Sequence, residues 1–209
     1  MTGPDLMALA VEERTELLAL LRGLTAAEWE ARSLCPQWRV RDVATHVVSY
    51  EELSPPSLVA TFLRGGLRVS AVNDVALKRY EHLAPEAVID LVARNLRPRG
   101  LTTGFGGGIA LTDGTIHHQD IRRALGLPRP IPATRLVPVL DFALRAPTLP
   151  ASKNAKGITL TATDLDWTSG DGPEVRGSGE ALLMAIAGRP QALGELDGPG
   201  LPTLRARVR

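Results

Sequence analysis

The sequence predicts an α+β protein that is mainly α-helical, with a helical bundle over residues 1–148 and a small α+β region over residues 149–209. Two observations carry this prediction. Before Pro147 the apolar residues recur with a period near 3.6, which is typical of amphipathic helices. After Gly157 apolar residues alternate with threonines, which is typical of a half-buried strand. We expect no strand before residue 140.

Helix signals follow one another through the first region. A broad apolar stripe predicts a first helix from Leu6 to Leu21. Thr25 and Glu28 form a capping-box pattern that opens a short helix ending near Ala31. Pro55 and Pro56 end the helix that begins at Val40. The complete set of further expected helices is Val40–Leu53, Leu58–Leu63, Val69–His82, Pro85–Leu96, Ala110–Leu125 and Pro132–Arg145.

The second region mixes both kinds of element. We expect a strand over Gly157–Thr163, a partner strand over Leu165–Thr168 and a turn over Ser169–Gly172. A third short strand at Val175–Gly177, a helix at Gly179–Ala187 and a last strand at Leu201–Val208 complete the expected order.

Composition narrows the classes of function. With 24 Lys and Arg against 23 Asp and Glu, the formal net charge is +1, which argues against nucleic-acid binding driven by bulk charge. No apolar run approaches the roughly 20 residues of a membrane-spanning helix. The N-terminal residues are acidic rather than basic, so we expect no secretory signal and a cytoplasmic protein. The single Cys35 excludes an internal disulfide and a CxxC metal site.

Asp113 and His117 are the first candidates for chemistry. They are four residues apart on an expected helix, so their side chains share one face and can reach the same metal ion. One histidine from a facing helix would complete a three-ligand site for Zn²⁺, Fe²⁺ or Ni²⁺. The alternative is that Asp113 only complements the helix dipole and that His117 is a partly buried histidine. His118 points about 100° away from His117, so we do not expect it to share the metal.

The other polar residues near Asp113 and His117 each allow two interpretations. Asp120 could orient a metal ligand or form a structural ion pair. Arg122 or Arg123 could bind a substrate carboxylate, or could form an ion pair with Asp120 or with the C-terminal region. Cys35 stands at a helix entry before a proline and a tryptophan, and we interpret it as a packed, small apolar residue rather than a nucleophile. The glycine-rich segment Gly104–Gly108 lacks a phosphate-loop pattern and is interpreted as a connection.

Two segments resemble the mycothiol-dependent maleylpyruvate isomerase family. Leu34–His46 is similar to a C-x-x-W-x-V-x-D-V-x-x-H motif, and Asp113–Gly126 is similar to an H-x-x-D-x-x-R-x-L-G helix. The resemblance implies a DinB-like four-helix bundle with a divalent metal held by His46, Asp113 and His117. Asp113 stands where the family has Glu, one methylene longer. Gly114 beside it could let the backbone approach the metal, or could be a weak point of the helix with no function.

The resemblance leaves two hypotheses of function. The first is a metal-dependent transferase or isomerase that uses a low-molecular-weight, mycothiol-like thiol and acts on a small electrophilic molecule. The expected metal is zinc, with nickel or iron as alternatives. The second is a non-catalytic DinB-like protein, for ligand binding or stress response, with a degraded or empty metal site. We expect the protein to bind a small-molecule substrate and to bind neither nucleic acid nor a membrane. A homodimer is possible on the sequence.

Overall fold

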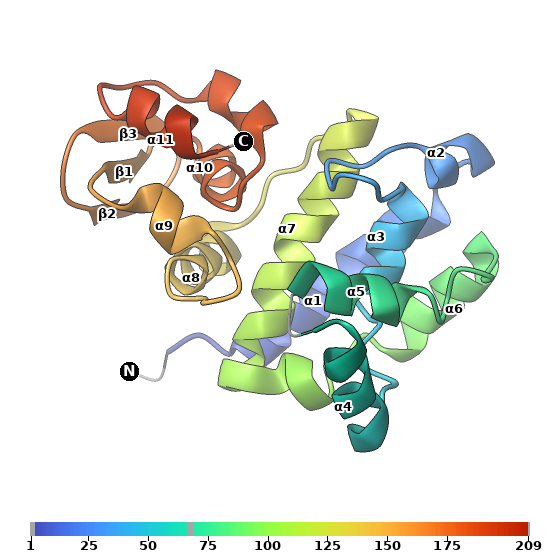
Figure 1. Cartoon of the computed structure of the whole chain (residues 1–209). Coiled ribbons are helices and arrows are strands. Elements are labelled where there is room, and N and C mark those ends of the chain that lie inside the picture. The colour runs from blue at the N-terminus through green and yellow to red at the C-terminus, as the bar shows by residue number, and fades with distance from the viewer. Residues whose placement is uncertain (1–2, 67–68, 209) are drawn as a thin grey trace. The chain divides into compact units, whose positions relative to one another are not determined.

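The computed structural model describes residues 3–66 and 69–208 of the chain. They form two compact units, Asp5–Arg129 and Pro130–Arg209, the second of which also includes the N-terminal residues up to Pro4 (Figure 1). Within the described residues, no helix is long and apolar enough to cross a membrane. The expected fold class, mainly α with a small α+β C-terminal region, is confirmed.

Four helices of the first unit pack in a closed ring. They are α1 (Leu6–Arg22), α3 (Val40–His46), α6 (Pro85–Arg94) and α7 (Gly108–Leu125). Helix α1 contacts α6 and α7, and α3 contacts the same two helices from the other side. The other helices of this unit are α2 (Ala26–Glu30), α4 (Pro55–Arg64), α5 (Val69–Leu77) and the 3₁₀ helix η1 (Gly100–Gly107). The first unit is therefore a four-helix bundle with additional short helices.

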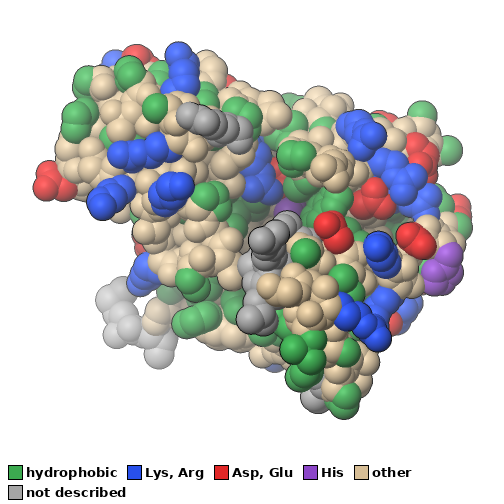
Figure 2. Space-filling view, viewed as in Figure 1, with side chains coloured by type: hydrophobic (Ala, Val, Ile, Leu, Met, Phe, Trp, Pro, Cys, Tyr) green, Lys and Arg blue, Asp and Glu red, His purple; other side chains and the backbone are tan. Residues whose placement is uncertain are grey.

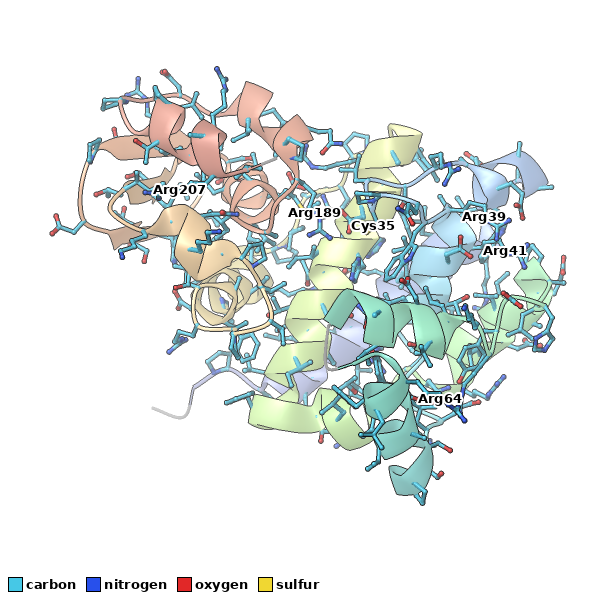
Figure 3. All side chains as sticks on the ribbon, viewed as in Figure 1. Cys35, Arg39, Arg41, Arg64, Arg189 and Arg207 are labelled. Carbon is cyan, nitrogen blue, oxygen red and sulfur yellow. The ribbon has the colours of Figure 1, made fainter. Side chains whose placement is uncertain are left out.

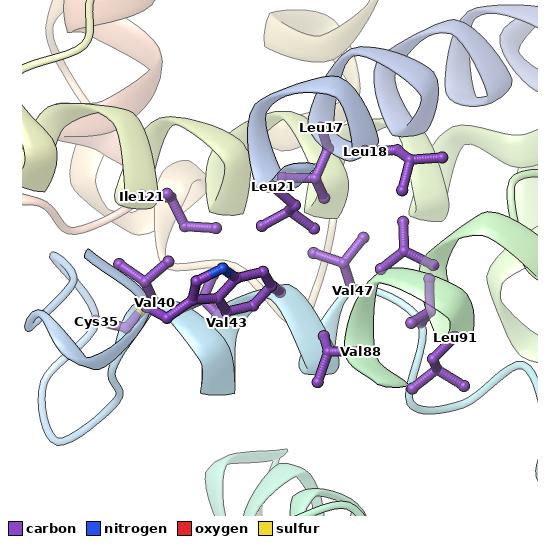
Figure 4. Close-up of a cluster of buried hydrophobic side chains, with 14 residues drawn as sticks. Leu17, Leu18, Leu21, Cys35, Val40, Val43, Val47, Val88, Leu91 and Ile121 are labelled. Atoms are coloured by element: carbon purple, nitrogen blue, oxygen red, sulfur yellow. The ribbon is translucent and has the colours of Figure 1, made fainter. Parts of the chain in front are cut away.

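Apolar residues from these four helices meet in one core. Figure 4 shows Leu17 and Leu21 of α1 facing Val43 of α3, with Val88 of α6 and Ile121 of α7 on either side. All five are at most 1% exposed, as the helical spacing of apolar residues predicts. This packing sets the orientation of α3 relative to α7, and so the faces that the two helices present to each other.

The predicted helix start at Thr25 is confirmed in detail. The hydroxyl of Thr25 accepts a hydrogen bond from the Glu28 backbone N–H, and the Glu28 carboxylate accepts one from the Thr25 N–H, which completes the capping box. Asp42 closes a similar turn at the start of α3, where it accepts from the backbone N–H of Arg39 at 2.9 Å. The start of the site-bearing helix α3 is thus encoded locally.

Helix α3 is shorter than expected. The prediction ran to Leu53, but the regular helix ends at His46 and continues as turns. Two tertiary contacts redirect the backbone there. The buried guanidinium of Arg14 donates to the carbonyl of Val47 at 3.2 Å and forms an ion pair with Glu51 at 2.6 Å. Since both partners are at most 1% exposed, this pair holds the segment after α3 against α1.

Within the glycine-rich segment, Gly104, Phe105 and Gly106 depart from helical φ/ψ, so the segment connects the first turn of η1 to α7, as expected. Gly107 has a φ of 97°, and a Cβ there would lie 2.9 Å from the Met7 Cα. Only glycine fits both conditions, because other residues rarely adopt this φ and a side chain would collide with the backbone of α1. Gly107 thereby lets α7 begin in contact with α1.

The second unit is built on a small sheet with the strand order β2-β1-β3. Strand β1 (Thr159–Ala162) pairs antiparallel with β2 (Thr168–Gly170) and parallel with β3 (Glu174–Gly177). The expected first and third strands are present. The partner strand is displaced towards the C-terminus, because Trp167 is buried and its indole N–H donates to Asp141 at 2.9 Å. The helices of this unit are α8 (Ala133–Ala143), α9 (Ala151–Ala155), α10 (Gly179–Ile186), η2 (Pro190–Glu195) and α11 (Leu201–Arg207).

Two further assignments differ from the sequence-based expectation. The last strand at Leu201–Val208 is wrong, because this segment forms the helix α11. Its apolar residues Leu201, Leu204 and Val208 are spaced for one helical face, and Pro202 suits the first helical turn. Helix α8, which we had placed in the bundle, groups with the second unit because it packs on α10, where Leu136 closely approaches Gly179.

Several charged residues at the surface of the bundle form ion pairs. Arg39 and Arg41 both bind Glu30, and Arg94 binds Glu52 at 2.6 Å. Figure 2 shows positive and negative side chains intermingled over this part of the molecule rather than gathered by sign. This distribution agrees with the near-zero net charge.

Candidate metal centre

Helices α3 and α7 bring three side chains from distant parts of the sequence to one point. His46 is the last residue of α3, and Asp113 and His117 lie one turn apart on the facing side of α7. One donor atom from each of the three residues lies within 4.8 Å of the other two. The structure therefore gathers the three residues that the resemblance implies as ligands.

The spacing of these atoms is informative. The Asp113 Oδ1 lies 3.6 Å from the His46 Nε2 and 3.5 Å from the His117 Nε2. Both separations are long for hydrogen bonds between these groups. Two ligand atoms that each lie about 2.1 Å from a tetrahedral metal are about 3.4 Å apart. The gap between the three side chains thus has the size that one metal ion requires.

The donor set also fits a divalent metal chemically. Two imidazole nitrogens and one carboxylate oxygen suit Zn²⁺, and are also accepted by Fe²⁺ and Ni²⁺. His46 is 4% exposed, and its Nδ1 has no hydrogen-bond partner within residues 3–66 and 69–208. The nitrogen of His46 that faces Asp113 is Nε2.

Asp120 holds the imidazole of His117 from behind. The Asp120 Oδ2 lies 2.9 Å from the His117 Nδ1, and the carboxylate is fully buried. With Nδ1 engaged in this way, Nε2 is the nitrogen that faces Asp113. A carboxylate behind a histidine is the arrangement that commonly orients an imidazole towards a metal.

The charges of this cluster support one another. Burial lowers the pKa of His117, but the carboxylates of Asp113 and Asp120 outweigh it, so the pKa of His117 lies well above its ordinary value. Burial raises the pKa of Asp113, but His117 and His46 bring it well below the usual range. Burial, together with the charge of Asp113, raises the pKa of Tyr50. Asp113 is therefore an ionised carboxylate at neutral pH.

Cys35 belongs to this cluster, contrary to its interpretation as an apolar packing residue. Figure 3 labels Cys35, which lies in the loop before α3. Its Sγ lies 3.0 Å from the Asp120 Oδ2, to which it donates a hydrogen bond, and 3.5 Å from the His117 Nδ1. Cys35, His117 and Asp120 thus form a second group of metal-ligating residue types. Their two shortest separations, 3.0 and 2.9 Å, are hydrogen-bond lengths rather than ligand-to-ligand spacings. We therefore assign this group to support of His117 and not to metal binding.

A pocket of about 460 Å³ opens beside His117. The loop before α3 and helix α5 form its walls, and the ring of Trp38 lies 4.9 Å from the ring of His46 and 6.0 Å from that of His117. Trp38 therefore does more than pack at the entry of α3. The lining residues are Cys35, Pro36, Gln37, Trp38, Asn73, Asp74 and His117.

His118 and Arg122 lie on another side of α7. The His118 Nδ1 is 2.7 Å from the Glu13 Oε1, and the Arg122 Nε donates to the His118 Nε2 at 2.8 Å. Arginine can only donate, so the His118 Nε2 carries no proton and the ring is neutral. His118 is thereby separated from the three candidate ligands, as expected. Substrate binding by Arg122 or Arg123 stays a prediction, and Arg122 is engaged by His118 and by the carbonyl of Leu127.

Sequence reasoning missed Cys35 and the pocket beside it. Cys35 and Asp120 are 85 positions apart, and no local pattern links them. The one available signal was that Cys35 and Trp38 stand in the same motif as His46.

Comparisons with known proteins agree with this architecture. Residues 10–99 match the family model of the mycothiol maleylpyruvate isomerase N-terminal domain, a segment that contains His46 but ends before Asp113 and His117. The crystal structure of the mycothiol-dependent maleylpyruvate isomerase is similar, with a TM-score of 0.56 and 16% identity over 95% of this chain and 96% of that chain. A point mutant of that isomerase has a TM-score of 0.53 over the same shares of both chains. A search of curated proteins finds no match.

Proposed function

We propose that this chain, which resembles the mycothiol-dependent maleylpyruvate isomerase family in its N-terminal domain and in its fold, is a metal-dependent enzyme that uses a low-molecular-weight thiol. It would transfer or isomerise a small electrophilic molecule. The observation that carries the proposal is the spacing of 3.5–3.6 Å between the Asp113 carboxylate and the two imidazoles. The thiol is mycothiol-like by this resemblance.

His46, Asp113 and His117 would hold the metal. A divalent metal bound there would lower the pKa of a thiol ligand, so that thiolate is available near neutral pH. Zinc fits the donor set best, with nickel or iron as alternatives.

The protein contributes position and shielding. Asp120 keeps the Nε2 of His117 directed at the centre. Trp38 and His46 pack ring against ring beside the pocket, which limits the access of water to the buried side of the site. The thiol and the electrophile would occupy the pocket that His117 borders, so that the sulfur meets the electrophilic carbon at the metal centre.

The proposal is tested by metal analysis of protein purified without a metal-binding tag, followed by zinc titration of the metal-free protein. We expect about one equivalent of zinc, and turnover of a generic electrophile only when a thiol is added. His117→Ala should abolish binding. His82→Ala is the matched control, because His82 is exposed and lies outside the site.

Two results would decide against an enzyme. If the three side chains bind neither zinc nor nickel, the replacement of the family's Glu by Asp113 has disabled the site. If metal binds but no thiol-dependent turnover of electrophiles is found, the non-catalytic ligand-binding alternative is the better description.

A further inference from the structure

We propose that Cys35 is a positioning residue of this centre, whose S–H group holds the Asp120 carboxylate in the orientation that directs His117 at the metal. This inference rests on the proposed function, because it assigns Cys35 a role at the same site. It differs from the sequence-based interpretation of Cys35 as packing, and it does not make Cys35 a nucleophile or a metal ligand.

The geometry places two donors on one oxygen. The Asp120 Oδ2 accepts from the Cys35 thiol at 3.0 Å and lies 2.9 Å from the His117 Nδ1. Cys35 is 8% exposed and Asp120 is fully buried, so the carboxylate depends on protein donors rather than on water. Removal of the thiol would leave less to hold this oxygen in place.

The backbone reinforces the same contact. The N–H of Leu34 donates to the carbonyl oxygen of Asp120 at 3.2 Å, which ties the loop before α3 to α7. Cys35 is therefore presented to Asp120 from a fixed loop and not from a freely moving one. The Ser33 hydroxyl adds to this rigidity, because it accepts from the Cys35 N–H at 3.1 Å.

The consequence for the centre follows from the two nitrogens of His117. When the Nε2 proton of His117 leaves on metal binding and Nδ1 still donates to Asp120, Nε2 carries the lone pair that a metal needs. If the Asp120 carboxylate rotates away, it no longer holds the imidazole of His117. The Nε2 atom is then less well directed at the metal and is less basic. Loss of such outer partners typically weakens metal binding about 10- to 100-fold.

Three variants separate positioning from packing. Cys35→Ser keeps a hydrogen-bond donor but is more polar, whereas Cys35→Val keeps an apolar side chain of similar bulk without a donor. Cys35→Ala removes the donor and leaves a small void. If Cys35 acts by positioning Asp120, Cys35→Ser should preserve zinc affinity, whereas Cys35→Val and Cys35→Ala should lose it. If Cys35 acts only by packing, Cys35→Val should preserve zinc affinity and Cys35→Ser should lose it.

The experiment measures zinc affinity by chelator competition for the wild type and the three variants. We expect a loss of about tenfold or more for Cys35→Val and Cys35→Ala, and little change for Cys35→Ser. Equal affinity of wild type and Cys35→Val would overturn the inference. If Cys35→Val does not fold, the comparison of zinc affinity between Cys35→Ala and Cys35→Ser decides the test.

Two further readouts keep this test separate from that of the proposed function. A crystal structure of metal-free Cys35→Val should show the 2.9 Å contact between His117 and Asp120 broken, whereas its retention would contradict the inference whether or not the wild type binds zinc. Cobalt substitution of the wild type should give no thiolate-to-metal charge-transfer band. Such a band would make Cys35 a ligand and would also overturn the assignment.

Discussion

His117 connects two groups of side chains through its two ring nitrogens. Nε2 faces Asp113, 3.5 Å away, and Nδ1 contacts Asp120 at 2.9 Å. The first separation suits a metal between the two atoms, and the second suits a direct hydrogen bond. At the scale of single residues, this difference of spacing is what distinguishes a metal ligand from its support.

Gly114 lies on the side of α7 that faces α1. A Cβ at this position would point at α1, where it would meet the Glu13 Cγ at 3.7 Å, an ordinary contact. The residue is therefore not required for approach of α7 to a metal.

Gly114→Ala should consequently stabilise the protein. Alanine lowers the conformational entropy of the unfolded chain, and a helical Gly costs about 0.5–1 kcal/mol relative to Ala. We expect the free energy of unfolding in urea to rise by up to this amount, with zinc affinity unchanged. A clear loss of stability would show that the space near Glu13 is tighter than its contacts suggest. Gly107→Ala, at a φ of 97°, is the contrasting variant and should be destabilising.

At the scale of elements, α1 and α7 are joined by a buried polar network. Glu13 binds His118 and Arg129, and Arg129 also binds Glu16 at 2.6 Å. Burial opposes ionisation of Glu13, but His118 and Arg129 outweigh it and lower the pKa of Glu13 to about 2. Burial also lowers the pKa of His118.

The helix pair should therefore weaken in acid. The pKa of Glu13 is lower in the folded than in the unfolded chain, so its contribution is complete above the ordinary value of 4.5 and is lost as the pH falls towards about 2. Glu13→Gln should cost on the order of 3 kcal/mol in the free energy of unfolding at pH 7. This difference should shrink between pH 4.5 and pH 2.

Urea unfolding of wild type and Glu13→Gln at several pH values measures this effect. Glu86→Gln, at an exposed residue of α6, serves as the surface control. A difference between wild type and Glu13→Gln that stays constant from pH 7 to pH 3 would contradict the assigned cause.

The sequence predicted long helices more accurately than short elements. Long amphipathic helices such as α1 and α7 were predicted closely, because each repeats its apolar period over several turns. Helix α11 was mistaken for a strand, because seven residues with three apolar positions give too few repeats to separate the two periods. The end of α3 was missed because Arg14, a residue of another helix, redirects it.

At the scale of the whole molecule, all three candidate ligands lie in the unit Asp5–Arg129. Ligand binding stabilises the folded state, by about 2.7 kcal/mol when the ligand concentration is 100 times Kd. A metal between α3 and α7 should act first on the unit that contains both helices.

Hydrogen exchange with and without zinc tests this expectation. Protection should increase along α3 and α7, and the strands β1 and β3 should change little. His46→Ala should remove the zinc effect. Increased protection confined to β1 and β3 would place the metal elsewhere.

The sequence by itself determined the bundle helices and the pairing of Asp113 with His117. Both depend on the geometry of one helix, in which residues four apart share a face whatever the rest of the chain does. The motif resemblance supplied His46 as a third candidate ligand, and the fold comparison agrees with the family that it indicated.

Only the tertiary structure decided how the site is assembled. His46 meets Asp113 because α3 and α7 pack in the same ring, and Cys35 meets Asp120 across 85 positions because the loop before α3 lies against α7. Contacts of this kind depend on which faces of two helices are buried together and at what angle. That relation belongs to the packed core and has no period or spacing along the chain from which it could be read.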